Sequence, residues 1–181
     1  MAAPEFDPER LLAALADGGV QCVLIGGMAA IVHGDVGVTL DLDIAPAFDD
    51  DNVERLAAVL RGLQARIRVE DEPEGLPFDC SAEFLRNLGP EGILNLTTSC
   101  GDLDLTFTPS GTGGYEDLRR DALSLPVGGA TMLVASLPDV IRSKEAAGRD
   151  KDRVALPRLR ALLERLQTRP RTGADDPDGP G

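Results

Sequence analysis

The sequence predicts a single α+β domain in which helices flank a mixed, largely antiparallel β-sheet. The chain has 181 residues, which is enough to enclose one hydrophobic core. Short apolar or alternating runs typical of strands are interspersed with segments whose apolar residues recur at helical spacing. We expect the domain to cover residues 1–167, with a C-terminal helical part at about 136–167. Residues 168–181 are dominated by Pro, Gly and Asp, which predicts a disordered tail.

Strand-like composition or alternation marks seven segments: residues 20–25, 38–44, 65–69, 93–98, 103–107, 123–127 and 131–134. Helical spacing and capping residues predict helices at about 8–17, 28–32, 49–62, within 78–88, 115–120, 136–147 and 151–166. The acidic segment 70–77 contains two prolines and a glycine and is expected to form a loop. Pro157 is expected to kink the last helix or delay its start. Six apolar residues of that helix are expected to face the core: Val154, Leu156, Leu159, Leu162, Leu163 and Leu166.

Composition favours a cytoplasmic protein without a membrane anchor. No run of eighteen apolar residues is present, which argues against a membrane-spanning helix. The acidic start of the chain lacks the apolar stretch of a signal peptide. Cys22, Cys80 and Cys100 are widely spaced and match no pairing motif, so we expect buried free thiols in a reducing compartment.

Charge is distributed unevenly along the chain. The net charge of −13 excludes a wholly basic nucleic-acid binder. Residues 142–171 nevertheless carry a net charge of +6, whereas residues 1–141 carry −16. A basic element beside an acidic body attracts polyanions. An ordinary solvated helix that neutralises the body explains the same charges, so the sequence leaves both interpretations open.

Residues 20–44 contain the pattern that most strongly indicates chemistry. Gly26 and Gly27 follow a buried strand and precede a short helix, so a phosphate can approach their bare backbone amides. In the next strand Asp41 and Asp43 share one face, because successive side chains alternate. Two adjacent carboxylates repel each other unless a cation lies between them. Hard oxygen ligands favour a divalent ion, Mg²⁺ or alternatively Mn²⁺.

Other polar residues are candidates for the same site. Asp104 is expected to be a third carboxylate on a later strand, with Asp102 on the same face as its competitor. The chain has sixteen Arg but only two Lys, Lys144 and Lys151. A compact ammonium fits between phosphate oxygens better than a planar guanidinium does, so both lysines are candidate phosphate ligands. The single histidine, His33, has no cluster of metal-ligating partners and is expected to be a packed or capping residue.

These motifs resemble the signature of the polymerase-beta-type nucleotidyltransferase superfamily. That signature is a Gly-Gly or Gly-Ser turn, a short helix and Asp-x-Asp on a strand. Gly26-Gly27-Met28-Ala29, His33-Gly34 and Thr39-Leu40-Asp41-Leu42-Asp43 resemble the fuller form in its AbiEii-like branch, which includes MenT-type toxins. The run from Lys144 to Asp152 resembles that branch's K-x-A-x-R-x-K-D segment. Branch members often carry Arg two residues before the Thr, where this chain has Gly37, so that phosphate contact is lost or made from elsewhere.

The resemblance implies a nucleotidyltransferase-like fold whose C-terminal helices close over the nucleotide. It implies metal-dependent transfer of a nucleoside monophosphate from an NTP to a hydroxyl. Asp41, Asp43 and Asp104 would hold the metal. Gly26, Gly27, Thr39, Lys144, Arg149, Lys151 and Asp152 would bind the nucleotide or organise that end of the site, with Lys144 on the triphosphate.

The branch further implies a toxin of a toxin–antitoxin pair that modifies the 3′ end of tRNA and has a cognate antitoxin. Transfer to a small molecule, AMPylation of a protein and a catalytically silent binding module remain the alternatives.

Overall fold

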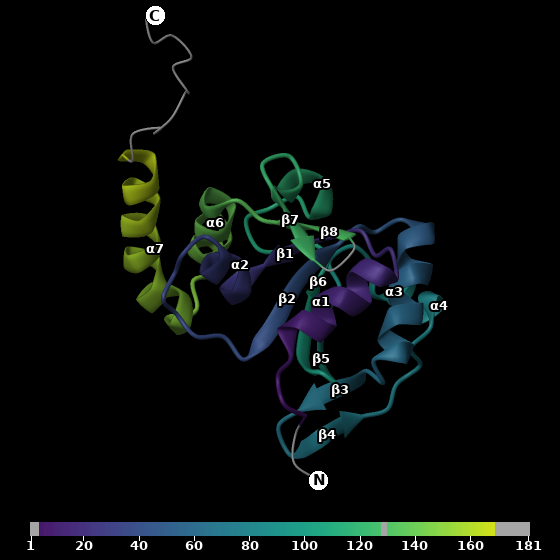
Figure 1. Ribbon diagram of the computed structural model, residues 1–181. Helices are drawn as coiled ribbons and strands as arrows, with labels where there is room; N and C mark the ends of the chain where they lie inside the picture. The colour runs from purple at the N-terminus through teal and green to yellow at the C-terminus, as the bar shows by residue number, and fades with distance from the viewer. Residues whose placement is uncertain (1–3, 128–129, 169–181) are drawn as a thin grey trace, which may run out of the picture.

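The computed structural model describes residues 4–127 and 130–168. Within them lie eight strands and seven helices (Figure 1). The strands are β1 (Cys22–Ile25), β2 (Asp41–Pro46), β3 (Arg66–Val69), β4 (Glu72–Leu76), β5 (Ile93–Thr98), β6 (Gly101–Thr106), β7 (Leu123–Val127) and β8 (Ala130–Val134). The helices are α1 (Pro8–Asp17), α2 (Gly26–Val32), α3 (Asp50–Gly62), α4 (Ala82–Leu88), α5 (Tyr115–Leu118), α6 (Leu137–Ala147) and α7 (Asp150–Thr168).

All eight strands belong to one sheet with the order β4-β3-β5-β6-β2-β1-β8-β7. The β2–β6 and β1–β8 pairs are parallel, and the other neighbours are antiparallel. The predicted mixed, largely antiparallel α+β architecture is therefore confirmed. The parallel β2–β6 pair is central to the site, because it joins two strands that are 55 or more residues apart in sequence into one ladder.

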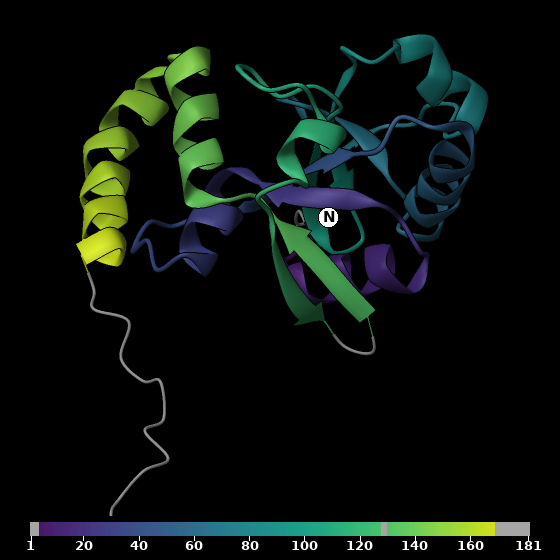
Figure 2. The same cartoon turned by 90° about the horizontal axis from the view of Figure 1, so that it is seen from above.

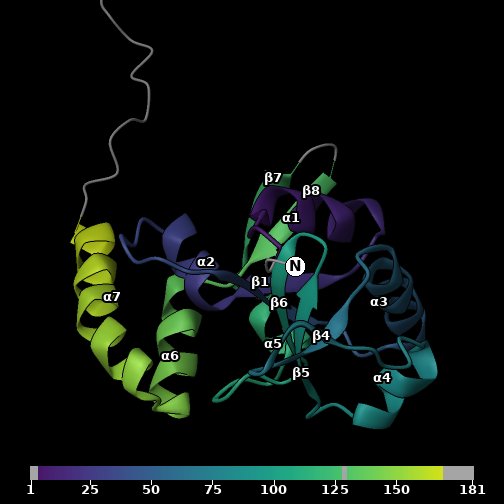
Figure 3. The ribbon, with the colours of Figure 1, turned by 90° about the horizontal axis from the view of Figure 1, so that it is seen from below.

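Two pairs of helices lie at opposite ends of the molecule. Figures 2 and 3 show α6 and α7 packed together at one end of the molecule, with α3 and α4 at the opposite end. The α2 helix lies between the sheet and α6. Side-chain caps begin several of these helices: Asp7, Asp49 and Ser136 accept from backbone amides three residues ahead at α1, α3 and α6.

One hydrophobic core joins the sheet to its helices. Leu42 and Ile44 of β2 are fully buried in it, whereas Asp41 and Asp43 of the same strand lie on the opposite face and are only partly buried. The α1 helix contributes Leu11 to this core. The alternation of β2 therefore divides its residues into a packing face and a face available for chemistry.

The structure corrects three details of the predicted elements. Residues 72–76, expected in a loop, form the edge strand β4, which accommodates Pro73 because an edge strand needs fewer backbone donors. The β2 strand begins at Asp41, and Leu40 before it is 74% exposed. In α7, Val154 and Leu166 are 75% and 42% exposed, so the prediction that they face the core is wrong.

The remainder of the C-terminal prediction is only partly covered by the described residues. Leu156, Leu159 and Leu162 of α7 are buried, and Leu163 packs against the core. Pro157 lies inside the helix rather than delaying its start. Of the predicted tail, residues 168–181, Thr168 is the last residue of α7 and residues 169–181 lie outside the described residues, so the domain boundary stays a prediction. Among the described residues, no helix is both long and apolar enough to span a bilayer.

Asn52 of α3 joins that helix to the residues that precede β1 and follow β2, the two strands that position the site. Its fully buried side chain donates to the Gln21 and Ala47 carbonyls at 2.9 and 2.8 Å and accepts from the Gln21 amide at 2.7 Å. Asn52→Ala leaves these groups unpaired and is expected to lower the free energy of unfolding by roughly 2–4 kcal/mol. Urea unfolding measures this, with Asn87→Ala on partly exposed α4 as the control. Equal stability of both variants contradicts the assignment.

Candidate active site

Three carboxylates converge where β2 and β6 pair. Asp43 lies beside Asp104 in the parallel register, and Asp41 lies beside Asp102. Asp41, Asp43 and Asp104 each contribute a carboxylate oxygen to a cluster in which these atoms lie within 4.8 Å of one another. Among the described residues, Asp102 is not a member of that cluster. The geometry therefore selects Asp104 over Asp102 as the third carboxylate.

Arg68 of β3 is a residue of this site that the sequence did not reveal. Its guanidinium bridges Asp102 at 2.9 Å and Asp104 at 2.8 Å. Arg68 reaches them across β5, which lies between β3 and β6. The alternation of residues 66–69 predicts a strand, but nothing local indicates which acids it will face. Arg68 therefore supplies part of the positive charge that holds Asp104 in place.

The carboxylate cluster is under electrostatic stress. Burial raises the pKa of Asp43 to about 6, and the neighbouring charges of Asp41 and Asp104 add to this increase. The charge of Lys151 and a hydrogen bond from the Gly27 amide oppose it. Burial also raises the pKa of Asp104, although Arg68 acts in the other direction. A divalent cation would relieve this repulsion, and the three oxygen donors fit the preferences of Mg²⁺.

The Gly26-Gly27 turn makes room for the carboxylate strand. Gly26 has φ +65°, and a Cβ at this position would lie 2.1 Å from Oδ2 of Asp43. A Cβ on Gly27 would lie 2.8 Å from Oγ1 of Thr39. The same hydroxyl donates to Oδ1 of Asp41 at 2.7 Å. Thr39 therefore orients Asp41, and the two glycines allow both side chains to approach the start of α2.

A buried acid outside the carboxylate cluster, Asp152, holds two cations of the C-terminal helices. Asp152 is fully buried at the start of α7, where its carboxylate accepts from Lys144 at 3.1 Å and from Arg149 at 2.7 Å. Burial alone would raise the pKa of Asp152, but the hydrogen bonds from Arg149 and Lys144 outweigh it and hold that pKa below its ordinary value. Asp152 thus stays ionised and fixes both cations beside the carboxylate cluster.

Two further cations line the same side of the site. Lys151 is exposed, and its charge lowers the pKa of Asp43. Arg158 of α7 pairs with Asp35, whose side chain is only 5% exposed. A Cβ on Gly37 would lie 2.9 Å from Nη2 of Arg158. The guanidinium of Arg158 therefore occupies the space into which a side chain at position 37 would project.

Two cavities meet at the carboxylates. The first, about 220 Å³, is bounded by Asp41, Asp43, both glycines of the turn, Thr39 and the cations Lys144, Arg149, Lys151 and Arg158. The second, about 390 Å³, contains Asp104 and Asp43 and extends between β5, β6, the loop of residues 109–114 and α6. Asp43, Gly26, Lys144 and Arg149 line both. All ten predicted site residues therefore lie in this region, Asp152 by holding two of the lining cations.

Comparison with solved structures identifies the architecture. The crystal structure of a proposed nucleotidyltransferase, TM1012 from Thermotoga maritima, matches with a TM-score of 0.52 and 14% identity, covering 92% of this chain and 98% of that one. The protein has a nucleotidyltransferase-like fold. The solution structure of the antibiotic-resistance factor ANT(2'')-Ia is also similar, with a TM-score of 0.43, 14% identity, and coverage of 88% and 92%. No protein-family model and no curated protein sequence matches the chain.

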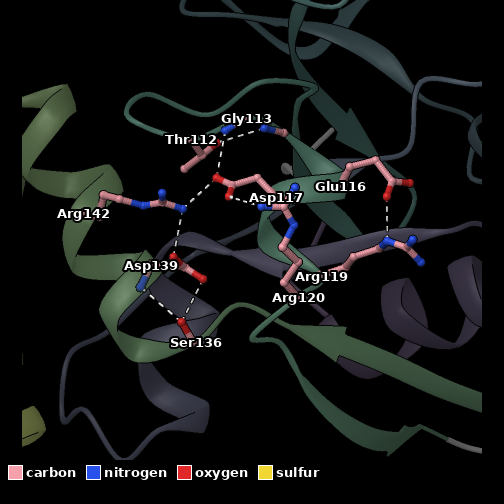
Figure 4. A network of polar contacts seen from close by, with 10 residues as sticks. Thr112, Gly113, Glu116, Asp117, Arg119, Arg120, Ser136, Asp139 and Arg142 are labelled. Carbon is pink, nitrogen blue, oxygen red and sulfur yellow. Dashed lines mark hydrogen bonds and ion pairs between the residues drawn. The ribbon is translucent and has the colours of Figure 1, made fainter.

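In this nucleotidyltransferase-like fold, a polar network joins α5 to α6 at the rim of the second cavity (Figure 4). Arg142 of α6 bonds Asp117 of α5 at 2.7 Å and Asp139 at 2.9 Å. Asp139 also accepts from Ser136 at 2.8 Å. The Gly113 amide donates to Asp117 at 2.9 Å, which ties the loop of residues 109–114 into the same network.

Residues outside the cluster have structural partners. His33 ends α2, and its Nε2 lies 2.8 Å from the Ala135 carbonyl, so the expectation of a packed or capping histidine is confirmed. The three cysteines are free; Cys22 and Cys100 are buried and Cys80 is half-buried. Burial raises the pKa of the Cys22 thiol to about 12, which keeps it protonated and unreactive.

Gly26→Ala tests whether the turn is shaped around Asp43. The new methyl group would collide with the Asp43 carboxylate, and the left-handed backbone at position 26 disfavours Ala. We expect a loss of roughly 1–3 kcal/mol in the free energy of unfolding and weaker Mg²⁺ binding. Thermal unfolding with and without Mg²⁺ measures both effects. Gly62→Ala is the control, since its Cβ meets nothing within 4 Å. Wild-type behaviour of Gly26→Ala would refute the close approach.

Asp43→Asn tests the electrostatic stress. Because the folded protein raises the pKa of Asp43 to about 6, its ionised form destabilises the fold above that pH. The variant should therefore be more stable than wild type at pH 7.5, by on the order of 1–3 kcal/mol, and this difference should shrink as the pH falls through about 6 and vanish only near pH 3, below the unfolded pKa of about 3.9. Thermal unfolding across this pH range without metal measures it. A variant less stable than wild type at pH 7.5 contradicts the prediction.

Proposed function

We propose that this protein is a metal-dependent nucleotidyltransferase that moves a nucleoside monophosphate from an NTP to a hydroxyl group. The observation that supports this most directly is the position of the carboxylate cluster at the junction of two cavities. Asp41 lines only the cation-rich cavity, Asp104 lines only the larger one, and Asp43 lines both. This arrangement provides separate places for a polyphosphate and for an acceptor, with the reacting phosphorus between them.

The first cavity suits the triphosphate. Four cationic side chains line it, and phosphate oxygens prefer charged donors. The Arg158 guanidinium lies 2.9 Å from where a Cβ at position 37 would be, the position at which members of the resembled branch often carry arginine, so this chain would make that phosphate contact from α7. Asp152 keeps Lys144 and Arg149 in place before the nucleotide arrives, which reduces the entropic cost of ordering them.

The second cavity suits the attacking hydroxyl. Asp104 has a raised pKa, which makes it a better proton acceptor than an ordinary exposed aspartate. Bound Mg²⁺ on the three carboxylates would neutralise phosphate charge and favour in-line displacement. The acceptor oxygen forms a bond to the α-phosphorus, the bond from that phosphorus to the bridging oxygen breaks, pyrophosphate leaves with the electron pair, and Asp104 receives the hydroxyl proton.

The motif resemblance supports a specific biological setting. In the AbiEii-like branch the acceptor would be the 3′ end of tRNA, and the protein would be a cytoplasmic toxin controlled by a cognate antitoxin. A small-molecule acceptor is the second candidate, and one observation favours it. Some of the cations that would form a basic surface for tRNA are paired with acids, since Arg153 pairs with Asp150 and Arg160 pairs with Glu145.

Labelled NTP supplied with Mg²⁺, total RNA, protein extract and small metabolites tests the proposal. We expect transfer of label by wild type, a loss of at least about 100-fold in Asp41→Asn and Asp104→Asn, and a loss of less than tenfold in Asp102→Asn. Absence of label in every fraction, together with no Mg²⁺-dependent NTP binding, would indicate a silent binding module. Growth arrest on expressing wild type but not Asp41→Asn would support the toxin setting.

A further inference from the structure

We infer that the second cavity accepts a small, uncharged or cationic polyol as the hydroxyl acceptor, rather than the end of a nucleic-acid strand. This inference rests on the proposed function and deepens it by naming the acceptor class. It follows from the charges of the cavity wall, from the cavity's size and from the pairing of the nearby basic residues.

The wall charge of the second cavity opposes an anionic acceptor. Three acids, Asp43, Asp104 and Asp139, line it. The two cations among its described lining residues are Lys144 and Arg149, which also line the first cavity and are assigned there to the triphosphate. The terminal nucleotide of an RNA would bring its backbone phosphate next to these acids. Phosphate contacts depend on Lys and Arg, and once the triphosphate takes Lys144 and Arg149 the described lining of this cavity offers no further one to an RNA phosphate.

The uncharged part of the wall fits a polyol. Hydroxyl and amide groups from Thr106, Ser143 and Asn95 alternate around it with apolar side chains such as Ile93 and Val140. Hydroxyl and amide groups can both donate and accept, so they can bind sugar-like hydroxyls in several orientations. Apolar side chains between them provide flat contacts for the carbon skeleton.

The second cavity is also bounded on one side by a loop that is fastened to α6. The loop of residues 109–114 runs toward α6 (Figure 2), and a Cβ on Gly111 would lie 2.7 Å from the Ala146 Cβ. The network around Asp117 and Arg142 fastens this loop and α5 to α6 (Figure 4). The resulting volume of about 390 Å³ is at the small end of the roughly 300–1,000 Å³ that small-molecule pockets occupy.

The basic residues outside the second cavity do not supply the cations that an RNA phosphate would need. Arg142 is bound to Asp117 and Asp139, Arg158 to Asp35, and Arg160 to Glu145. Among the described residues after position 141, Lys151 and Arg165 are the cations for which no ion pair is present. Lys151 lines the first cavity, where the triphosphate is placed. Of these paired cations, Arg142 and Arg158 bind acids of residues 1–141 and Arg160 binds an acid of the C-terminal helices, so few are left for an RNA phosphate.

A transfer assay with matched acceptors tests this inference. Wild type, Mg²⁺ and NTP labelled at the α-phosphate are incubated separately with glucosamine, an aminocyclitol, myo-inositol, glucose 6-phosphate and total tRNA. We expect label on at least one of the uncharged or cationic polyols, at a rate at least tenfold above that for glucose 6-phosphate and for tRNA. Label that appears preferentially on tRNA or glucose 6-phosphate overturns the acceptor class while leaving nucleotidyl transfer intact.

Two variants tie the outcome to the second cavity. Ser110→Arg places a cation in its exposed loop wall, and Ser143→Phe fills it from α6. Both should raise KM for the polyol at least tenfold while the Kd for Mg²⁺-NTP changes less than twofold, because neither residue lines the first cavity. Ala155→Phe, on the first cavity only, should weaken NTP binding instead. Unchanged polyol KM in both Ser110→Arg and Ser143→Phe refutes the assignment.

Discussion

Repulsion between three aspartates is the constraint on which the site depends. The β2–β6 register places Asp43 directly beside Asp104, and Asp41 joins them from the same face of β2. Hydrogen bonding of the sheet is what holds these like charges together, because their mutual interaction and their burial both oppose it. The raised pKa of Asp43 is the energetic cost of holding the three carboxylates in this fixed geometry.

The residues around the cluster reduce this repulsion, each in a different way. Thr39 donates to Asp41, the Gly27 amide donates to Asp43, and Arg68 binds Asp104. None of them cancels the charge completely, so the cluster would still attract a cation. Arg68 has a further consequence, since a metal that reaches Asp104 must share that carboxylate with a guanidinium. Metal binding and the position of Arg68 are therefore coupled through one side chain.

Features of the fold and the site that depend on residues close together in the sequence could be predicted, whereas contacts between distant segments could not. The two-residue period of β2 predicts that Asp41 and Asp43 share a face, and the N-caps predict α1, α3 and α6 closely. The position of Arg68 could not be predicted, because it depends on β5 lying between β3 and β6. The β4 strand was missed because Pro73 and Gly75 suit an edge strand as well as a loop. Val154 was misassigned because apolar spacing does not distinguish a core from a cavity wall, and this side chain lines the first cavity.

The diglycine turn shows how a correctly recognised motif can have an additional physical reason. The sequence suggests that bare amides there receive a phosphate. The described contacts show that the same bare backbone first admits the Asp43 carboxylate and the Thr39 hydroxyl, with separations that no Cβ would permit. A phosphate held at this turn would therefore lie directly beside the carboxylates, and only a cation between the two anionic groups makes that proximity favourable. The need for glycine and the proposed need for metal would thus arise from a single requirement, the close packing of negative charge against the start of α2.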